Sequence, residues 1–322
     1  MSSKPVEYNA TVTYKKLLTP TLGLFRVVAD KPWPSFIPGQ YAILGLNHPE
    51  QGGVMRAYSI ASAPHLHEQY LEFYIRFVNE PTSDNPMTHL LFEAKEGDRI
   101  YTRDKLQGHF TEEKCMGVED KRLKIFVASG TGLAPFTSIV FEHHKHHGAN
   151  GNYAIVHGAS YAKDLGYVDE LEEIMNKGAE HPRYLPSVSR PQETANWEGL
   201  TGRVEVHFQQ DRIGYLEKKL GLDEEGFNPK NCTVMICGLQ GTIANTITSL
   251  LYRGFVPGDR KLRRALGVPE EMAATLFFEQ YDTTPIIDIK DEALIAELSA
   301  RLKEALEKFG KDLPTASAVA AH

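Results

Sequence analysis

The first third of the chain contains short runs of β-branched and aromatic residues that are separated by turn residues. Pro38-Gly39, Gly52-Gly53 and Gly97-Asp98 are among the separators, and such pairs are typical of the turns between strands. Several short strands within about 115 residues predict a closed antiparallel β-barrel or a β-sandwich. The predicted strands are Tyr8 to Tyr14, Leu22 to Val28, Tyr41 to Leu46, Tyr70 to Val78 and Arg99 to Tyr101.

The period of the apolar positions changes between Pro86 and Ala94. Met87, Leu90 and Leu91 fall at helical spacing in this stretch, together with Ala94. The pattern predicts one short helix that is inserted into the β domain.

From Arg122 onward, strand-like and helix-like segments alternate. A continuous apolar run at 123–128 is followed by a glycine-containing turn and a helical pattern that reaches about His146. This alternation predicts a doubly wound parallel sheet with helices on both faces. The fold class is therefore β plus α/β, with predicted domains at residues 1–117 and 118–282. Further strands are expected at Tyr153 to Gly158, Tyr184 to Ser189 and Val234 to Gly238, and a further helix at Tyr167 to Met175.

Residues 283–322 form a C-terminal extension in this interpretation. Leu294, Leu298, Leu302 and Phe309 lie on one face of a predicted amphipathic helix whose other face is charged. We expect this helix to dock on its own chain and the small, polar residues 314–318 to be flexible.

The composition excludes several classes of protein. The net charge of -7 disfavours nucleic acid as a partner. The start of the chain has no signal-peptide pattern, and no apolar run approaches the roughly 20 residues that cross a bilayer, so we expect a cytoplasmic protein without membrane insertion. The chain has three cysteines, which disfavours a disulfide framework and excludes a four-cysteine iron–sulfur centre within it.

The segment from Arg56 to Ser62 combines a cation, an aromatic ring and hydroxyl groups. Arg56 offers a rigid donor fork for a pyrophosphate. Tyr58 can stack on a planar ring, and Ser59 can donate a hydrogen bond to a ring nitrogen. The segment favours a ligand with an anionic end and a planar aromatic end, such as a flavin dinucleotide. A buried strand with a paired arginine is the alternative interpretation.

The segment from Ser129 to Pro135 follows the first predicted parallel strand and opens a helix. Gly130 and Gly132 let the backbone approach an anion closely, and the helix N-terminus offers free N–H groups. A doubly wound sheet binds a dinucleotide pyrophosphate at this position. The full G-x-G-x-x-G pattern is absent, so an ordinary tight turn is the alternative.

Two further segments have more than one interpretation. Cys237-Gly238-Leu239 ends another predicted parallel strand, where a cysteine either packs in the core or contacts a nicotinamide ring. The run from His143 to His147 contains imidazole pairs at helical spacing. We expect no metal there, because the run closes a helix, where cations favour the dipole, and no carboxylate or cysteine is expected at ligand spacing.

Four segments together resemble the ferredoxin–NADP reductase superfamily over about residues 6–282. Residues 156–165 and 105–110 are more similar to its bacterial flavodoxin/ferredoxin reductase branch. The resemblance implies an FAD-binding antiparallel β-barrel joined to a nucleotide-binding α/β domain. The four segments are Arg56-Ala57-Tyr58-Ser59 for R-x-Y-S, Gly130 to Phe136 for G-T-G-x-A-P, Cys237 to Gly241 for C-G-L-x-G, and Glu279-Gln280-Tyr281 for the terminal E-x-Y.

The resemblance implies roles toward FAD for the matching residues. Arg56 would hold the pyrophosphate, Tyr58 would stack on the isoalloxazine, and Ser59 would hydrogen-bond to flavin N5. Tyr281 would cover the other face until the nicotinamide displaces it. The other implied FAD-binding residues are Ala57 in the motif, Tyr74 and Arg76 on the adjoining strand, and Met87 and Thr88 at the start of the inserted helix.

The resemblance also implies the reaction. Ser59, Cys237, Glu279 and Tyr281 would form the catalytic set around nicotinamide C4 and flavin N5, where a hydride is transferred. The electrons would pass to or from a small acidic carrier, ferredoxin or flavodoxin. The residues do not set an oligomeric state. A basic rim would attract the carrier, with Arg103, Lys105, Lys261, Arg263 and Arg264 as candidates.

The implied coenzyme is NADP(H), with NAD as the alternative. Related bacterial sequences have arginine where this chain has Ser160, whereas Arg190 and Arg203 persist. Two guanidinium groups near a 2′-phosphate favour NADP. The implied coenzyme-binding residues also include Gly130, Thr131 and Gly132 in the first turn, and Cys237, Gly238 and Leu239 in the second.

Two other functions are compatible with these motifs. One is an NADH-dependent reductase component of an oxygenase system, and the other is a flavin-bearing electron-transfer subunit of a larger complex. Both usually include a cysteine-bound iron–sulfur cluster, which this chain cannot supply.

The length after Tyr281 departs from the family pattern, in which this tyrosine is often the last residue. Here 41 residues follow it, so the segment Asp282 to Pro285 must turn the chain away. The extension then packs elsewhere, gates the nicotinamide site or crosses to another subunit.

Overall fold

The computed structural model describes residues 3–80, 85–117, 119–148, 151–281 and 284–309. The chain groups into two compact units. Unit 1 comprises Met1–Thr111 and Ala134–Gly148, and unit 2 comprises Glu112–Leu133 and Ala149–His322. The domain limits expected from the sequence, 117/118 and 282/283, stay a prediction.

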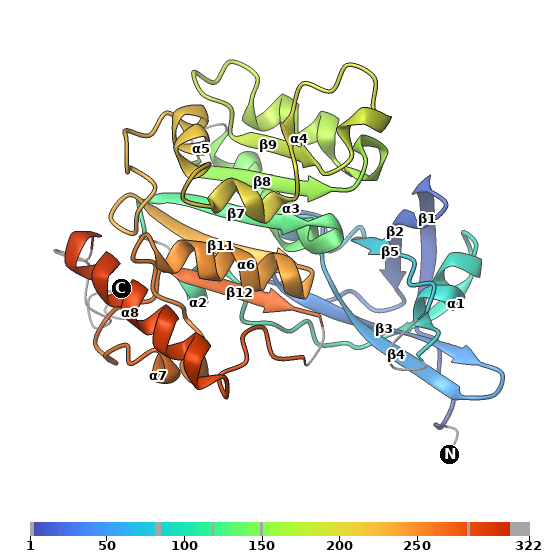
Figure 1. Cartoon of the computed structure of the whole chain (residues 1–322). Helices are drawn as coiled ribbons and strands as arrows, with labels where there is room; N and C mark the ends of the chain where they lie inside the picture. Colours follow the sequence, from blue (N-terminus) through green and yellow to red (C-terminus); the bar gives the residue numbers. More distant parts are fainter. Residues whose placement is uncertain (1–2, 81–84, 118, 149–150, 282–283, 310–322) are drawn as a thin grey trace. The chain divides into compact units, whose positions relative to one another are not determined.

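Unit 1 is built on six antiparallel strands in the order β4-β3-β6-β1-β2-β5. Strands β1 to β5 are labelled in Figure 1. The outer strands meet in an antiparallel bridge between Ile60 and Phe73, so the sheet closes on itself. The predicted β-barrel is confirmed. The strands are β1 (Ala10–Thr19), β2 (Leu22–Ala29), β3 (Tyr41–His48), β4 (Gly52–Ser59), β5 (Leu71–Arg76) and β6 (Arg99–Thr102).

Strand β4 is the main departure from the sequence pattern, which placed a break at Gly52-Gly53. Both glycines lie within the strand, and Gly52 pairs with His48 across the hairpin that joins β4 to β3. Gly52 has a φ of +73°, which glycine adopts at little cost. The strand is therefore held by pairing with β3 rather than by β-branched residues, which its sequence largely lacks.

Two helices pack on the barrel of unit 1. The inserted helix is confirmed as α1 (Met87–Glu93), with Met87 and Leu91 buried in the barrel core. The second is α3 (Ala134–His147), which follows the glycine-containing turn. Its buried Ser138 hydroxyl donates to the Ser62 carbonyl at 2.8 Å, and the Thr137 hydroxyl lies 3.0 Å from the Ala61 carbonyl. These bonds satisfy polar groups that would otherwise be buried unpaired.

Unit 2 contains six parallel strands in the order β10-β9-β8-β7-β11-β12. The strand order runs outward from β7 in one direction and from β11 in the other, so the predicted doubly wound sheet is confirmed. Only the short β10 and the aromatic β12 went unpredicted. The strands are β7 (Leu123–Ser129), β8 (Tyr153–Ala159), β9 (Tyr184–Val188), β10 (Leu200–Thr201), β11 (Cys232–Gly238) and β12 (Leu276–Gln280).

The helices of unit 2 cover the sheet and its ends (Figure 1). Short 3₁₀ helices occur at η2 (Gly130–Leu133), η3 (Ala162–Asp164), η4 (Pro191–Glu193) and η5 (Val204–Phe208). The α-helices are α2 (Glu112–Cys115), α4 (Val168–Met175), α5 (Ile213–Leu220), α6 (Gln240–Leu251), α7 (Arg260–Ala265) and α8 (Glu292–Phe309).

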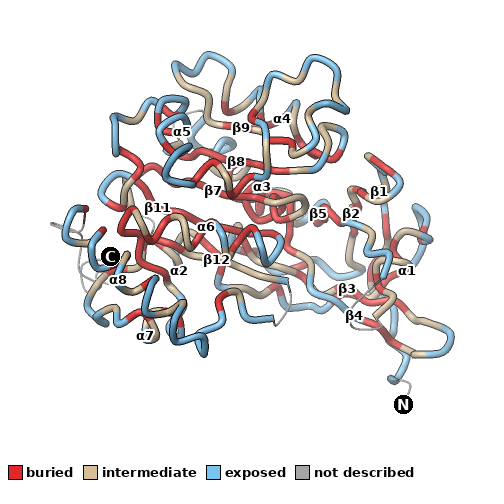
Figure 2. The backbone as a smooth tube through the Cα atoms, viewed as in Figure 1, coloured by how far each residue is buried: buried red, intermediate tan, exposed pale blue. Residues whose placement is uncertain are grey.

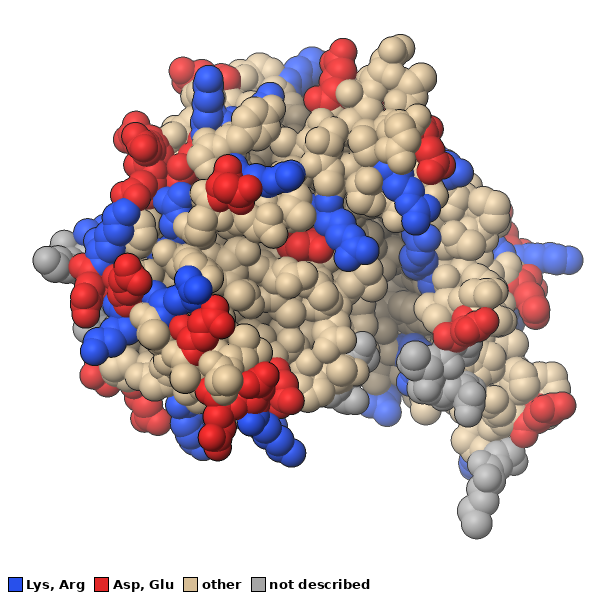
Figure 3. Space-filling model, in the orientation of Figure 1, with Lys and Arg blue, Asp and Glu red and all other residues tan. Residues whose placement is uncertain are grey.

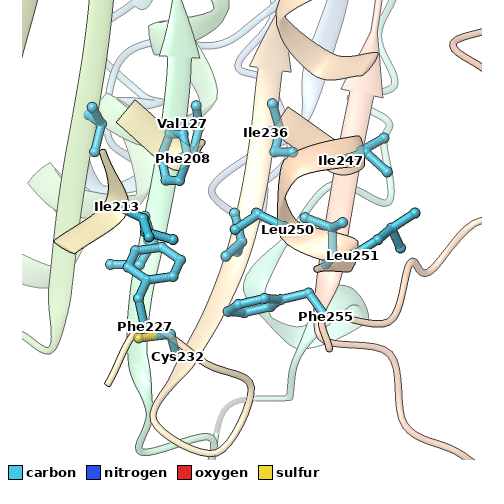
Figure 4. Packing of buried hydrophobic residues seen from close by; sticks show 14 of the residues in the cluster. Val127, Phe208, Ile213, Phe227, Cys232, Ile236, Ile247, Leu250, Leu251 and Phe255 are labelled. Carbon is cyan, nitrogen blue, oxygen red and sulfur yellow. The ribbon is translucent and has the colours of Figure 1, made fainter. Parts of the chain in front are cut away.

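The core of unit 2 lies between the central strands and their helices. Every residue of β11 is buried, which explains its continuous apolar sequence (Figure 2). Phe208 and Phe227 pack edge to face, and Phe227 and Phe255 pack with tilted rings, along this side of the sheet beside Ile236 of β11 and Leu250 of α6 (Figure 4).

Helix α8 docks on its own chain, as the sequence predicts. Leu298 and Leu302 are buried in the same apolar cluster as the residues of α6. Phe309 lies near Arg253, whose guanidinium is 5.9 Å from the ring centroid and pairs with buried Glu217 at 3.2 Å. Exposed acidic and basic side chains are interspersed over α7 and α8 (Figure 3). The extension therefore covers both apolar surface and a buried ion pair.

Some expectations concern residues outside the described part of the chain. Asp282 and Thr283 in the turn after Tyr281, and the flexible segment 314–318, belong to this group. Within the described residues, no helix combines the length and the apolar character needed to cross a bilayer.

Leu302→Ala tests whether α8 is part of the core of unit 2. The side chain is 2% exposed, and truncating such a buried leucine lowers the free energy of unfolding by about 2–5 kcal/mol. Lys303→Ala, on the exposed face of the same helix, should change it by less than about 0.5 kcal/mol. Urea denaturation measures both, and equal stabilities for the two variants would mean that α8 is not a core element.

Candidate functional site

The carboxyl ends of β7 and β11 define a topological switch point in unit 2. The two strands are parallel neighbours, and the chain leaves them toward opposite sides of the sheet order. Ligands of doubly wound sheets bind in the crevice at this point. The turn Gly130–Leu133 follows β7, and Gly238 ends β11, so both predicted nucleotide segments meet here.

The two segments meet backbone to backbone. A Cβ on Gly132 would collide with the Cys237 carbonyl oxygen and lie 2.8 Å from the Gly238 Cα. A Cβ on Gly238 would lie 2.6 Å from that of Ser129. Any side chain at either glycine would push the loops apart, so the close approach explains why these positions are glycine.

Three predicted catalytic residues come together beside this contact. In the parallel register of β11 and β12, Cys237 is the partner of Glu279. The Cys237 thiol lies 3.4 Å from the Tyr281 hydroxyl, which in turn donates to the Thr131 carbonyl at 3.2 Å. The structure thus brings Cys237, Glu279 and Tyr281 to one edge of the sheet, next to the nucleotide turn.

The environment keeps the Cys237 thiol protonated. Burial raises its pKa well above the usual range, and the nearby Glu279 carboxylate raises it further, against a smaller opposite effect of the Tyr281 hydroxyl. A neutral thiol in this position is a polarisable contact surface and not a nucleophile. This favours contact with a ring over covalent chemistry.

The ends of β9 and β10 place two arginines at matching positions. Thr201 pairs with Val188, so Arg203 and Arg190 each lie two residues beyond a paired position on neighbouring parallel strands. Both side chains are exposed. The register explains how two cations far apart in sequence converge at the same edge of the sheet.

An aromatic ring joins this basic group. The Arg190 guanidinium lies 5.2 Å from the centroid of the Tyr161 ring and donates to its hydroxyl, and the Lys163 ammonium lies 5.3 Å from the same ring. The Ser160 carbonyl accepts from the Arg190 N–H at 3.0 Å. Lys163 and Tyr161 had no assigned role in the sequence analysis, yet both flank the predicted position of the 2′-phosphate.

His157 contacts the turn after β7, and none of the sequence motifs predicts this. It is fully buried in β8, where Nε2–H donates to the Gly130 carbonyl at 3.2 Å and Nδ1 accepts from the Tyr184 hydroxyl at 3.1 Å. Burial lowers its pKa to about 4, against the opposite effect of the bond to Gly130. The neutral imidazole therefore fixes the start of the nucleotide turn. Its only sequence signal was a polar residue inside an apolar strand.

The flavin motif of unit 1 lies on edge strand β4. Arg56 and Ala57 are exposed, and a strand at this edge has backbone groups that can bind a ligand. The Tyr58 hydroxyl is shielded from solvent and has no hydrogen-bond partner among the described residues, and burial raises its pKa above the usual value. A buried donor of this kind indicates a partner from outside the described residues.

The remaining predicted flavin residues surround β4. Ser59 and Tyr74 are buried, and the bridge between β4 and β5 brings their strands side by side. Arg76 is exposed at the end of β5. Thr88 Oγ1 accepts from the Val78 N–H at 3.2 Å, so α1 is attached to the end of β5.

Met87 is part of the barrel core. Its side chain is 1% exposed within the barrel core, and its N–H donates to Asn85 Oδ1 at 3.0 Å. Asn85 also donates to the Met55 carbonyl at 3.4 Å, next to Arg56. These contacts hold the start of α1 close to the motif strand.

One member of the predicted basic rim has a different role. The Arg263 guanidinium donates to the carbonyls of Pro257, Pro269 and Met272 at 2.7–3.4 Å. Burial lowers its pKa. Arg263 therefore ties together the loops around α7, while Lys261 and Arg264 on the same helix are exposed.

Comparisons with known proteins agree with this architecture. Residues 126–247 match the family model of the oxidoreductase NAD-binding domain. A flavodoxin/ferredoxin–NADP reductase of Shigella flexneri is 31% identical over 226 residues, which are 70% of this chain and 83% of that protein. The protein of the same name from Escherichia coli (strain K12) is 30% identical over the same coverage.

Two further comparisons widen the range of relatives. Sulfhydrogenase 1 subunit gamma of Pyrococcus furiosus is 29% identical over 249 residues, which are 76% of this chain and 74% of that protein. Among solved structures, a ferredoxin NADP+ reductase from Neisseria gonorrhoeae with bound FAD and NADP matches with a TM-score of 0.67 at 22% identity. The match covers 86% of this chain and 100% of the Neisseria gonorrhoeae chain, and it supports the two-domain fold.

His157→Gln should lose less free energy of unfolding than the wild type as the pH falls below 6.5. Between pH 6.5 and about 4 the unfolded chain binds a proton at His157 and the folded chain does not, so the free energy of unfolding falls as pH falls. One such group contributes about 1.4 kcal/mol per pH unit. Gln keeps a donor for Gly130 but does not titrate.

Urea denaturation at pH 7, 6 and 5 measures this effect. The wild type should lose more stability over this range than His157→Gln, whereas exposed His144→Gln should follow the wild type. Buried His207, whose pKa burial and Arg212 also lower to about 4, accounts for a remaining slope in all three proteins. Parallel curves for the wild type and His157→Gln would contradict a lowered pKa of His157, because they would mean that the folded and unfolded states bind its proton equally.

Proposed function

Because the chain belongs to the family of flavodoxin/ferredoxin–NADP reductases, we propose that it is an FAD-dependent oxidoreductase that transfers electrons between NADP(H) and a small one-electron carrier. The observation that supports this most directly is the group of Cys237, Glu279 and Tyr281 beside the nucleotide turn. Such a group offers a neutral, polarisable surface for a nicotinamide ring next to a site for its pyrophosphate.

The residues of unit 1 fit FAD. Tyr58 has a buried hydroxyl that lacks a partner among the described residues, and a bound flavin dinucleotide has polar groups that can satisfy it. Arg56 and Arg76 are exposed cations on neighbouring strands and suit a pyrophosphate. Tyr58 stacks on the isoalloxazine in this proposal, and Ser59 hydrogen-bonds to its ring nitrogen. Ala57 contributes backbone groups of the edge strand.

Helix α1 completes the flavin site in this proposal. Thr88 accepts from Val78, which leaves its own hydroxyl proton to donate to a phosphate oxygen. Met87 supports that position from the barrel core rather than through a polar contact. The arrangement explains why the helix is inserted between β5 and β6.

FAD, when bound, supplies the chemistry that links two-electron hydride transfer to one-electron release. The protein supplies position and electrostatics. His157 holds the Gly130 carbonyl, so the N–H groups of the turn are oriented before the coenzyme arrives. Tyr281 occupies the contact with Thr131 and Cys237, and it must move before a nicotinamide can bind there.

We propose that the coenzyme is NADP(H) rather than NAD(H). Arg190 and Arg203 lie at matching positions on β9 and β10, and Tyr161 with Lys163 adds an aromatic surface and a third cation. A 2′-phosphate carries two negative charges and favours such a group. Lys163 compensates for the arginine that related sequences have at Ser160.

The carrier is proposed to be an acidic ferredoxin or flavodoxin. Exposed Lys261 and Arg264 in unit 2, and exposed Arg103 and Lys105 in unit 1, are the candidate contacts. Arg263 is excluded from this set because its donors are used within the chain. Charge attraction of this kind accelerates association and weakens with salt. The reaction is proposed to take place in the cytoplasm.

Rapid mixing tests the function. The purified protein should contain flavin, and anaerobic NADPH should bleach its visible absorbance faster than NADH does. The reduced protein should then reduce an oxidised flavodoxin or ferredoxin. A protein that contains no flavin and takes up none when FAD is supplied would contradict the proposal.

The double variant Arg190→Ala/Arg203→Ala tests the choice of coenzyme. Loss of two charge-assisted contacts should raise the KM for NADPH by about 10²-fold and leave the KM for NADH nearly unchanged. Arg301→Ala on α8 removes a partly exposed arginine elsewhere and serves as the control. Equal effects on both coenzymes would remove the assignment of the 2′-phosphate site.

A further inference from the structure

A cluster of three metal-ligating side chains lies in unit 1, and none of the three is among the residues assigned to FAD and NADP(H). His65 from η1 (Pro64–Leu66) and Glu142 and His146 from α3 each direct one ligand atom into the cluster. These three atoms all lie within 4.8 Å of one another. The sequence analysis expected no carboxylate at ligand spacing, and this was wrong, because Glu142 precedes His146 by one helical turn.

The carboxylate of Glu142 is the centre of the cluster. Its two oxygens accept from different imidazoles, His65 Nδ1 at 2.7 Å and His146 Nε2 at 3.0 Å. The His65 backbone N–H donates to the same oxygen as its ring at 3.0 Å. The carboxylate is thus already aimed between two imidazole nitrogens.

The donor set and its geometry suit a divalent transition metal. Zinc takes histidine nitrogens at about 2.0–2.1 Å and carboxylate oxygens at about 2.0–2.2 Å, commonly with two histidines, one glutamate and a water. An ion that replaces the two ring protons needs only small rotations, since both nitrogens already touch the carboxylate. The side chains are 21–54% exposed, so ions can reach them.

Contacts outside the cluster hold helix α3 against the segment that contains His65. Ser138 and Thr137 of α3 bond to the carbonyls of Ser62 and Ala61, which holds the chain after β4 along the helix. His65 lies three residues further along the same segment, opposite Glu142. Glu142 and His146 lie one turn apart on one helix face. The site is therefore built from two elements whose relative position is set independently of any metal.

We propose that His65, Glu142 and His146 form a binding site for one Zn²⁺ ion or a similar borderline transition metal. A bound ion links the segment that follows the flavin motif to α3, and so it stabilises unit 1. Mg²⁺ does not bind there, because it prefers oxygen ligands in octahedral geometry. The proposal does not depend on the identity of the coenzyme or of the electron carrier.

Calorimetric titration of untagged, flavin-loaded protein with Zn²⁺ tests the site after treatment with a chelator. The expected result is one ion per chain and a melting temperature that rises with Zn²⁺ and not with Mg²⁺. Glu142→Gln and His65→Ala should each weaken binding by about tenfold or more and abolish the rise. His146→Ala, at the most exposed ligand, provides a third variant whose folding is not in question.

The other histidines of α3 provide the controls. His144→Ala removes an exposed imidazole outside the cluster and should bind Zn²⁺ like the wild type. His143 and His147 form a rival pair, with ring centroids 4.7 Å apart. The proposal is overturned if no Zn²⁺ binds at millimolar concentration, if binding survives Glu142→Gln and His65→Ala, or if only His143→Ala/His147→Ala abolishes it.

Discussion

The close approach of Gly132 to the Cys237 carbonyl is the contact on which the coenzyme site depends. It brings the turn after β7 against the end of β11, two segments that are about a hundred residues apart in the chain. The parallel pairing of β11 with β12 then adds Glu279 beside Cys237, and Tyr281 reaches back to Thr131. A side chain at position 132 would push the two loops apart, and these groups would then no longer share one edge of the sheet.

The same edge shows how buried polar residues prepare a binding loop. His157 is neutral and fully buried, and it uses one nitrogen for the Gly130 carbonyl and the other for Tyr184. Its contribution is positional, since it touches the backbone of the turn and not a ligand. Helix α8 contributes by packing on the apolar residues of α6 and does not take part in the contacts described at the carboxyl edge of the sheet.

Much of this architecture follows from sequence patterns, and the exceptions have physical causes. The apolar runs of β7 and β8 and the stripe of α8 predict their elements correctly, because burial on both faces of a strand leaves a continuous apolar run and burial of one helix face leaves a helical period. Strand β4 was only the alternative interpretation of the segment around Arg56, because few of its residues favour a strand and its pairing with β3 holds it in place. The role of Arg263 was missed because its partners are nearby backbone carbonyls, which leave no mark in the sequence, and Glu142 was missed because His65 comes from a distant segment. The family resemblance already predicted Glu279 near Cys237, and the register of β12 pairs the two residues.

The rate of flavin reduction by NADPH in Gly132→Ala tests the central contact most directly. The added methyl group collides with the Cys237 carbonyl, whereas Gly241→Ala on α6 adds one where no atom lies within 4 Å. The account predicts normal flavin content in both variants and a loss of about 10²-fold or more in reduction rate at low NADPH for Gly132→Ala alone. A Gly132→Ala protein that NADPH reduces as fast as the wild type would contradict it.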